Sequence, residues 1–365
     1  MKKIMLVFGT RPEAIKMCPI VKELKQRNHF EVCVCVSGQH KEMLEQVLKI
    51  FDVECDYNLS IMKPKQTLYD VTSNVLLAMK QVLEMEVPDI VLVHGDTTTT
   101  FSAALACFYS GIKIGHVEAG LRTYNLNAPF PEEFNRQAVG IISKYHFAPT
   151  KQAAEYLIKE GKNKEDIYIT GNSAIDALTQ TLSHKFDHPL LEWAKGYRLI
   201  VLTAHRRENL GKPLHHIFKA ISRIVNDFSD VKVIYPIHLN PSIKEVAKLY
   251  FDQQEKMVLT EPLDVIGFHH LLKASYLILT DSGGIQEEAP ALGKPVLVLR
   301  DVTERPEGIC AGTLKLVGTQ ENHLYNEIAS LLTNQEAYQK MSNAKNPYGD
   351  GHTSEYIADI LEKVL

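Results

Sequence analysis

The sequence of 365 residues lacks a long apolar run and lacks an excess of basic residues. No stretch approaches the ~20 apolar residues of a membrane-spanning helix, and the apolar run at residues 4–8 is too short for a signal peptide. The formal net charge is −4, so the chain has no basic surplus with which to neutralise a phosphate backbone. We therefore expect a cytoplasmic globular protein with neither a membrane nor a nucleic-acid partner.

Metal and dinucleotide signatures are also missing. The six cysteines include no C-x-x-C pair, which argues against a zinc site and against thioredoxin-like chemistry. No group of histidines and acids has the spacing of metal ligands, so we expect no metal. The glycine pattern G-x-G-x-x-G is absent after the first apolar run, so NAD is not expected and we predict no cofactor.

Short apolar runs alternate with longer segments of helical period, which is the pattern of a parallel sheet covered by helices on both faces. The first series of predicted strands comprises residues 4–8, 32–36, 90–93 and 112–117. The second series comprises residues 199–203, 231–236, 257–259, 276–280 and 296–299. This pattern predicts an α/β protein with two doubly wound, Rossmann-like domains that face each other across a cleft.

Glycine, proline and asparagine interrupt the pattern over residues 170–197. We place the N-terminal domain at residues 1–170 and the C-terminal domain at residues 171–351. The last amphipathic segment, residues 352–365, can pack on either domain, including back onto the first. Ligands of doubly wound sheets bind beyond the carboxyl ends of the strands, so the residues that follow each predicted strand are the functional candidates.

Four acidic residues stand out in the first domain. Asp96 and Glu118 each follow a predicted strand, and neighbouring strands lie ~4.8 Å apart, so both carboxylates are expected in one crevice. Asp96 could instead cap the next helix. Glu132 and Glu133 start another predicted helix, where the helix dipole alone would favour them. If one of the two joins Asp96 and Glu118, mutual repulsion raises a carboxyl pKa and suits it to proton transfer.

Basic and glycine-rich turns supply candidate anion sites. Arg11 follows the first strand in a turn that Gly9 permits, and it either meets an anion or is a surface arginine. In the second domain, His205 directly follows a strand and is expected to point into the cleft; a satisfied polar residue with no functional role is the alternative. The turn 282–284 leads from a strand into a helix, and its free N–H groups could hold a diphosphate; a plain structural turn is the alternative.

Seven segments together resemble the non-hydrolysing UDP-N-acetylglucosamine 2-epimerases over nearly the whole chain: FGTRPEAIKM, HGDTTT, GHVEAGLRT, PEE-x-NR, HRREN, TDSGGIQEEAP and RDVTERPE. The resemblance implies a fold like that of the B-type glycosyltransferases, usually as a homodimer. It implies reversible interconversion of UDP-GlcNAc and UDP-ManNAc, which supplies sugars for cell-envelope polysaccharide.

Matching motif positions imply roles for individual residues. The implied catalytic residues are Asp96, Glu118, Glu132 and His205. The implied substrate contacts are Arg11, Lys16, Phe268, Ser282, Gly283, Gly284, Glu288 and Arg305. Members of the family from bacteria also carry a second UDP-GlcNAc site that activates the enzyme, and its implied residues are Gln39, Arg206 and His238.

The resemblance implies elimination of UDP to 2-acetamidoglucal followed by its re-addition, and the sequence leaves three other functions open. A hydrolysing relative would release UDP and free ManNAc. A glycosyltransferase would share the fold and the donor but transfer the sugar to an acceptor. A non-catalytic sensor would bind UDP-GlcNAc without forming UDP-ManNAc.

Overall fold

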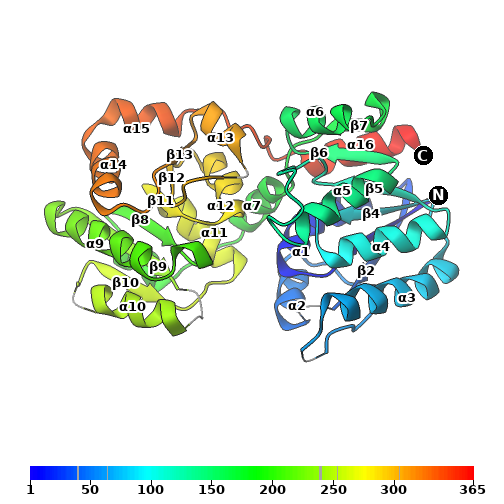
Figure 1. The fold of residues 1–365 in the computed structure, drawn as a ribbon, viewed down its shortest axis with the longest axis horizontal. Coiled ribbons are helices and arrows are strands. Elements are labelled where there is room, and N and C mark those ends of the chain that lie inside the picture. Colours follow the sequence, from blue (N-terminus) through cyan, green and yellow to red (C-terminus); the bar gives the residue numbers. More distant parts are fainter. Residues whose placement is uncertain (39–40, 64, 238–240, 253, 304) are drawn as a thin grey trace. The chain divides into compact units, whose positions relative to one another are not determined.

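Figure 1 shows the computed structural model, which describes residues 1–38, 41–63, 65–237, 241–252, 254–303 and 305–365. The chain forms two compact units. Unit 1 comprises Met1–Gln180 and Tyr348–Leu365, and unit 2 comprises Thr181–Pro347. Each unit contains a parallel sheet with helices packed on it, which confirms the predicted fold class of two parallel-sheet α/β domains.

The described residues of unit 1 form a parallel sheet in the order β3-β2-β1-β4-β5-β6-β7. Strand order reverses between β1 and β4, and doubly wound sheets bind ligands beside such a reversal. The strands are β1 (Lys2–Phe8), β2 (Phe30–Val36), β3 (Tyr57–Asn58), β4 (Ile90–His94), β5 (Lys113–Val117), β6 (Tyr145–Ala148) and β7 (Ile167–Ile169).

Helices cover both faces of this sheet (Figure 1). On one face α3, α4 and α5 lie side by side over Met5, Val7 and Val93. On the other face α1 packs against α2 and α16. The helices are α1 (Arg11–Gln26), α2 (Lys41–Ile50), α3 (Leu68–Glu86), α4 (Thr98–Tyr109), α5 (Glu132–Ile142), α6 (Lys151–Lys159), η1 (Lys164–Asp166), α7 (Ala174–Leu182), whose last residues enter unit 2, and α16 (Thr353–Val364).

The sheet of unit 2 runs in the order β10-β9-β8-β11-β12-β13. Its core alternates along β8, because Ile200 and Leu202 face α9, α10 and α14 whereas Leu199 and Val201 face α8, α11 and α12. The strands are β8 (Arg198–Thr203), β9 (Val231–Pro236), β10 (Met257–Thr260), β11 (Leu277–Thr280), β12 (Val296–Val298) and β13 (Leu314–Leu316). The helices are α8 (Pro189–Ala194), η2 (Arg207–Asn209), α9 (Lys212–Asp227), α10 (Pro241–Phe251), α11 (Val265–Ala274), α12 (Gly283–Glu288), η3 (Ala289–Leu292), α13 (Pro306–Ala311), α14 (Glu321–Thr333) and α15 (Gln335–Ser342).

The division between the units lies ten residues later than the boundary we placed after residue 170, and the chain returns to unit 1 at Tyr348 rather than at residue 352. Hydrogen bonds explain the difference. The carboxylate of Asp176 on α7 accepts from the backbone N–H of Ser354 at 2.7 Å and from that of Thr353 at 3.3 Å. These bonds fix the start of α7 to the start of α16, so residues 171–180 belong to unit 1.

In the described part of the chain, no helix combines the length and the apolar content needed to cross a membrane. The cysteines are free thiols, and most of them are buried. Burial raises the pKa of Cys18 and of Cys107 to about 12, so both thiols stay protonated and unreactive at neutral pH.

Candidate active site

The carboxylate of Glu118 sits just beyond β5 and contacts residues from other elements of unit 1. Lys16 on α1 donates a hydrogen bond to its Oε2, and Asn172 Nδ2 donates to the same oxygen at 2.9 Å. His94 Nε2, at the end of β4, lies 3.7 Å away. The backbone of Glu118 has a φ of 61°, in the left-handed region that a residue with a side chain rarely adopts. Such a conformation persists where surrounding contacts determine it, often at functional sites.

Asp96 lies two residues beyond the end of β4, the strand that pairs with β5. Arg136 Nη2 on α5 forms an ion pair with its Oδ2 at 2.7 Å, and Asn135 Nδ2 donates to its backbone oxygen at 2.9 Å. The side chain that caps α4 is Thr97, which accepts from Thr100 N at 3.1 Å. The alternative interpretation of Asp96 as the cap of this helix is therefore wrong.

The electrostatic surroundings of Asp96 suit proton exchange. The pKa of Asp96 is raised to about 6, chiefly by burial and to a lesser extent by the charges of Glu118 and Glu132, while Arg136 opposes the shift. The side chain nevertheless keeps 27% of its surface exposed, so a ligand can reach it. A carboxyl group with this pKa gives and takes a proton near neutral pH.

The two adjacent glutamates at the start of α5 have different environments. Glu133 is fully buried and its carboxylate accepts from the backbone N–H groups of Thr123 and Tyr124 at 2.9 and 3.0 Å. Gln137 Nε2 also donates to Glu133, at 2.7 Å. Glu133 therefore fixes the loop before α5, whereas Glu132 remains partly exposed and close enough to influence Asp96.

Helix α1 carries two of the predicted substrate contacts, Arg11 in its first turn and Lys16 beside Glu118. The buried carboxylate of Glu13 fixes the start of helix α1. One oxygen of Glu13 accepts from Thr10 N at 2.7 Å, and the other accepts from Thr97 Oγ1 at 2.7 Å. Glu13 thereby joins the turn after β1 to the start of α4, which holds Arg11 next to the strand-order reversal.

In unit 2, the predicted catalytic His205 is supported by Asp281. The Asp281 carboxylate is fully buried, and its Oδ2 accepts from the backbone N–H groups of His205 and Arg206, each at 2.8 Å. Asn209 Nδ2 donates to the same oxygen at 2.9 Å. Oδ1 lies 3.3 Å from Nδ1 of the His205 ring. The turn after β8 therefore depends on a carboxylate at the end of β11.

The glycine turn predicted to hold a diphosphate connects β11 to α12. Ser282 precedes the helix, and Gly283 and Gly284 form its first residues. The Arg305 guanidinium lies over Gly283, where an added Cβ would come within 2.7 Å of Nη1. Arg305 Nε donates to Glu287 Oε1 at 2.7 Å, which fixes that guanidinium beside the turn. Any larger residue here would have to displace the guanidinium, which packs directly on the backbone.

Glu288, one of the implied substrate contacts, is the last residue of α12 and lies near a histidine of α11. His269 Nε2 on α11 lies 3.6 Å from Glu288 Oε2, and Nδ1 of the same ring is 2.6 Å from Thr181 Oγ1. Phe268 precedes His269 on α11 and is partly buried against the hydrophobic core of unit 2. Both predicted contacts thus lie on the helices that cover one face of the unit 2 sheet.

The predicted site residues thus fall into one group in each unit. The group in unit 1 consists of Arg11, Lys16, Asp96, Glu118 and Glu132. The group in unit 2 consists of His205, Arg206, Phe268, Ser282, Gly283, Gly284, Glu288 and Arg305. Gln39 and His238, implied for an activating site, lie outside the described residues.

The residues that hold these side chains were not among the predicted ones. They are Glu13, Arg136, Asn172 and Asp281. Glu13, Arg136 and Asp281 stand inside the segments that carry the family resemblance, so their presence in FGTRPEAIKM, PEE-x-NR and TDSGG was an available signal. Asn172 stands in the break between the domains and carried no such signal.

Among the described residues, no group of three or more histidine, cysteine and acidic side chains is arranged to hold a metal ion. The carboxylates of unit 1 are instead paired with Lys16 and Arg136.

Comparison with known proteins gives a consistent result. The sequence profile of the UDP-N-acetylglucosamine 2-epimerase family matches residues 22–362. A UDP-N-acetylglucosamine 2-epimerase of Bacillus subtilis is 55% identical over 359 residues, which cover 98% of this chain and 94% of that protein.

Two solved structures have the same fold over the full length. A putative UDP-N-acetylglucosamine 2-epimerase from Listeria monocytogenes has a TM-score of 0.95 and 52% identity, with 100% of this chain and 96% of that chain covered. The UDP-GlcNAc 2-epimerase of Neisseria meningitidis, solved with UDP-GlcNAc bound, has a TM-score of 0.90 and 44% identity, with 99% and 100% covered. With the paired carboxylates of unit 1 and the glycine turn of unit 2, these matches show that the chain belongs to the UDP-N-acetylglucosamine 2-epimerase family.

Proposed function

We propose that this chain catalyses the reversible epimerisation of UDP-N-acetylglucosamine at C2, giving UDP-N-acetylmannosamine without net hydrolysis. The observation that carries the proposal is the group of three carboxylates in unit 1, in which Asp96 has its pKa raised to about 6. Inversion at C2 requires a proton to leave one face and another to arrive on the opposite face, and carboxyl groups of this kind suit both steps. The relative solved with UDP-GlcNAc supports the substrate class.

Elimination and re-addition account for the chemistry with no redox step. The proton at C2 has no neighbouring carbonyl to acidify it, so its direct removal would be very slow. In the proposed route the C1–O bond to the diphosphate breaks while C2 loses its proton, which gives UDP and 2-acetamidoglucal. UDP then adds back at C1 while C2 receives a proton on the other face. Atoms and electrons balance, so no cofactor is needed.

The two groups of residues divide this work in the proposal. In unit 2, Arg305 and the Ser282–Gly284 turn stabilise the charge of the departing diphosphate. In unit 1, Glu118 opposes the positive charge that develops at C1 and the ring oxygen. Asp96 and Glu132 are the groups that exchange protons with C2. His205 contributes either to diphosphate binding or to proton transfer.

A proton NMR time course with UDP-GlcNAc as sole substrate tests the proposal. We expect UDP-ManNAc to appear without free UDP, and in D₂O we expect deuterium at C2 of the product. Accumulation of UDP with free ManNAc would indicate the hydrolysing reaction instead, transfer of GlcNAc to an acceptor would indicate a glycosyltransferase, and binding without turnover would indicate a sensor. A product that contains no deuterium would rule out the elimination route.

Substitution of the acids tests their roles. Because each positioned proton transfer is typically worth ~10²–10⁴ in rate, Asp96→Asn and Glu132→Gln should each lower kcat by at least 10²-fold. Glu192→Gln is the control, because Glu192 is an exposed glutamate on α8 of unit 2 and is not part of the carboxylate group. A wild-type rate in either active-site variant would remove that residue from the mechanism.

We also propose that UDP-GlcNAc activates the enzyme at a second site, and that its product supplies cell-envelope polysaccharide. Arg206 is the described residue of the implied activating site, and Asp281 holds its backbone at 2.8 Å. The reverse reaction gives the test, because UDP-ManNAc alone should react slowly until a trace of UDP-GlcNAc is added. Linear progress from the first moment would refute activation.

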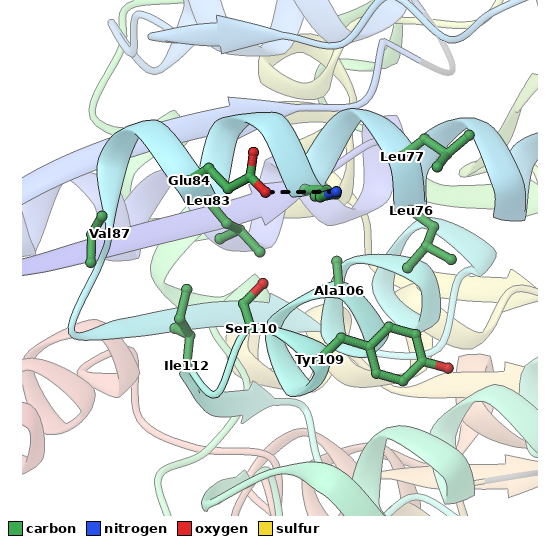
Figure 2. A pocket seen from close by; sticks show the side chains of 10 residues that line it. Leu76, Leu77, Leu83, Glu84, Val87, Ala106, Tyr109, Ser110 and Ile112 are labelled. Atoms are coloured by element: carbon green, nitrogen blue, oxygen red, sulfur yellow. Dashed lines mark ion pairs between the residues drawn. The ribbon is translucent and has the colours of Figure 1, made fainter.

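A homodimer is the proposed assembly, and a groove in unit 1 supports it. Figure 2 shows Leu76 of α3 above Tyr109 of α4, and Val87 above Ile112. Leu77, Val87 and Tyr109 are among the residues that line a groove of about 560 Å³ here. These three apolar side chains are 65%, 70% and 71% exposed, which is unusual for so large an apolar surface unless a partner covers it. The Lys80–Glu84 ion pair also lines the groove, so the surface carries both signs of charge and can meet a second copy of itself without repulsion of like charges.

We propose that a second copy of this chain covers the groove. In sedimentation equilibrium, Tyr109→Asp should shift the protein toward monomer, because dimerisation would bury a carboxylate that has no opposite charge beside it. Leu249→Asp is the control, since Leu249 is 61% exposed on α10 of unit 2. Equal dimerisation of Tyr109→Asp and the wild-type chain would place the interface elsewhere.

A further inference from the structure

Asn172 is an amide buried against a predicted catalytic carboxylate. The residue is 3% exposed, and its Nδ2 donates to Glu118 Oε2 at 2.9 Å. Its Oδ1 accepts from the backbone N–H of Ala174 at 3.0 Å, at the first residue of α7. Because both ends of the amide are bonded, the donor end is fixed toward Glu118 and a flip of the amide would break both contacts.

The backbone of Asn172 is fixed as firmly as its side chain. Its N–H donates to the carbonyl of Tyr348 at 2.7 Å, so the segment that leaves unit 1 is bonded to the segment that returns to it. The neighbouring Gly171 has a φ of 87° and packs against Gly349, where an added Cβ would lie 3.2 Å from the Gly349 Cα. The two crossing segments therefore touch through their backbones, which leaves Asn172 little freedom to move.

Glu118 needs such support because its own position is unfavourable. The left-handed backbone of Glu118 would relax without external contacts, and relaxation would redirect the carboxylate. Lys16 supplies charge to Oε2 but sits on a flexible four-carbon chain, which can follow the carboxylate. His94 lies 3.7 Å from the same oxygen, beyond hydrogen-bond distance, and burial lowers the pKa of His94 so that its ring is neutral. Of these three contacts, the hydrogen bond from Asn172 best fixes the direction of the Glu118 carboxylate, because both ends of the Asn172 amide are hydrogen-bonded.

We propose that Asn172 is a positioning residue for the reaction, which directs the Glu118 carboxylate from the segment that connects the two units. This inference rests on the proposed function, because it requires Glu118 to act on the sugar. It assigns a role to a residue that lies outside every segment of the family resemblance.

Asn172→Asp is the sharpest test because it changes one NH₂ to oxygen and keeps the acceptor for Ala174. The second carboxylate removes the hydrogen bond to Glu118 and disfavours its charged form, so the acid limb of the kcat profile should move to higher pH. At pH 7 we expect kcat to fall by roughly ten-fold or more, while KM stays within about two-fold. Asn343→Asp is the charge-matched control, since Asn343 is exposed at the end of α15 and should leave the profile unchanged.

Two further variants keep the result decisive. If Asn172→Asp does not fold, Asn172→Ala removes the donor without adding charge, and it should lower kcat with little change in KM. In a Glu118→Gln background, Asn172→Asp should add little, because a positioning residue acts through the group it positions. An unchanged kcat in both Asn172 variants would overturn the inference, and so would the same fractional loss with and without Glu118.

The outcome for Glu118 separates this inference from the proposed function. A wild-type rate in Glu118→Gln would overturn the catalytic role of Glu118, and with it both proposals for this carboxylate. A slow Glu118→Gln variant together with a wild-type pH profile and kcat in both Asn172 variants would overturn the inference alone.

Discussion

Asp96→Asn is expected to make the protein more stable at neutral pH while it removes activity. Burial raises the pKa of Asp96 from 3.8 in a model compound to about 6 in the folded protein, despite the ion pair with Arg136. Between pH 3.8 and about pH 6, Asp96 is therefore mostly protonated in the folded state and mostly ionised in the unfolded state. Stability falls as pH rises through that window, because the folded state must then hold an unfavourable charge.

The size of the effect follows from the shift. A difference of about two pKa units corresponds to roughly 3 kcal/mol at about 1.4 kcal/mol per unit. The side chain keeps 27% of its surface exposed, and screening by solvent reduces the effect, so we expect about 1–3 kcal/mol. Asparagine resembles the protonated acid, so Asp96→Asn should match the wild-type protein near pH 4 and exceed its stability by this amount above about pH 7.

Urea denaturation at a series of pH values measures this difference through the transition midpoint. Asp89→Asn is the control of opposite sign. Hydrogen bonds from Lys3 N at 2.8 Å and Lys2 Nζ at 2.9 Å lower the pKa of Asp89, so its charged form is stabilising and its loss should destabilise the protein at neutral pH. A stability difference between Asp96→Asn and wild type that does not grow between about pH 4 and pH 7 would refute the reasoning.

Three further substitutions have defined outcomes. His205→Asn should lower kcat and leave the thermal unfolding temperature nearly unchanged, since the ring is 39% exposed; an unaltered rate would exclude it from the reaction. Gly283→Ala should raise KM for the nucleotide sugar, because the new Cβ would lie 2.7 Å from Arg305 Nη1 and displace that guanidinium, as steady-state kinetics would reveal. Gly120→Ala should reduce soluble yield and stability, because Gly120 has a φ of 88° and a Cβ there would collide with the carbonyl of Ala153; a normal denaturation midpoint would disprove this account.

The regular part of the fold could be predicted because buried parallel strands are continuous apolar runs. Strands β1 and β4 are fully or almost fully apolar where they were predicted, and the structure places both at the centre of the sheet. Strand β6 (Tyr145–Ala148), which contains a histidine, was not among the predicted strands. His146 is nevertheless buried, and burial lowers its pKa to about 4, so the neutral ring packs as an uncharged side chain.

The boundary between the units could not be placed correctly from composition. Glycine and proline mark where regular structure stops, but they do not show to which unit a short helix belongs. The start of α7 stays with unit 1 because Asp176 bonds the backbone of Ser354, which is 178 residues away in the sequence. A contact of that range leaves no local pattern.

In the candidate site, too, residues marked by a local pattern could be predicted, whereas residues placed by long-range contacts could not. Side chains expected to meet a ligand follow strand ends directly, so a rule about parallel sheets finds Asp96, Glu118 and His205. Side chains that hold them come from elsewhere in the chain, as Asp281 illustrates, which lies 76 positions after His205. In the sequence, such a polar residue looks the same as one on the solvated surface. Only its burial in the structure distinguishes a supporting residue from a surface residue.

The adjacent glutamates of α5 show most clearly why local sequence patterns cannot distinguish a functional residue from a structural one. Glu132 and Glu133 have the same charge, the same position in the first helical turn and the same expected interaction with the helix dipole. One residue of helix rotation separates their directions by about 100°. That rotation sends Glu133 into the loop at Thr123, where its carboxylate accepts two backbone N–H groups, and it leaves Glu132 beside Asp96. The path of the loop decides which glutamate becomes structural, and the loop in turn depends on Glu133. Charge and helix position therefore could not separate the two glutamates, and only the family resemblance singled out Glu132.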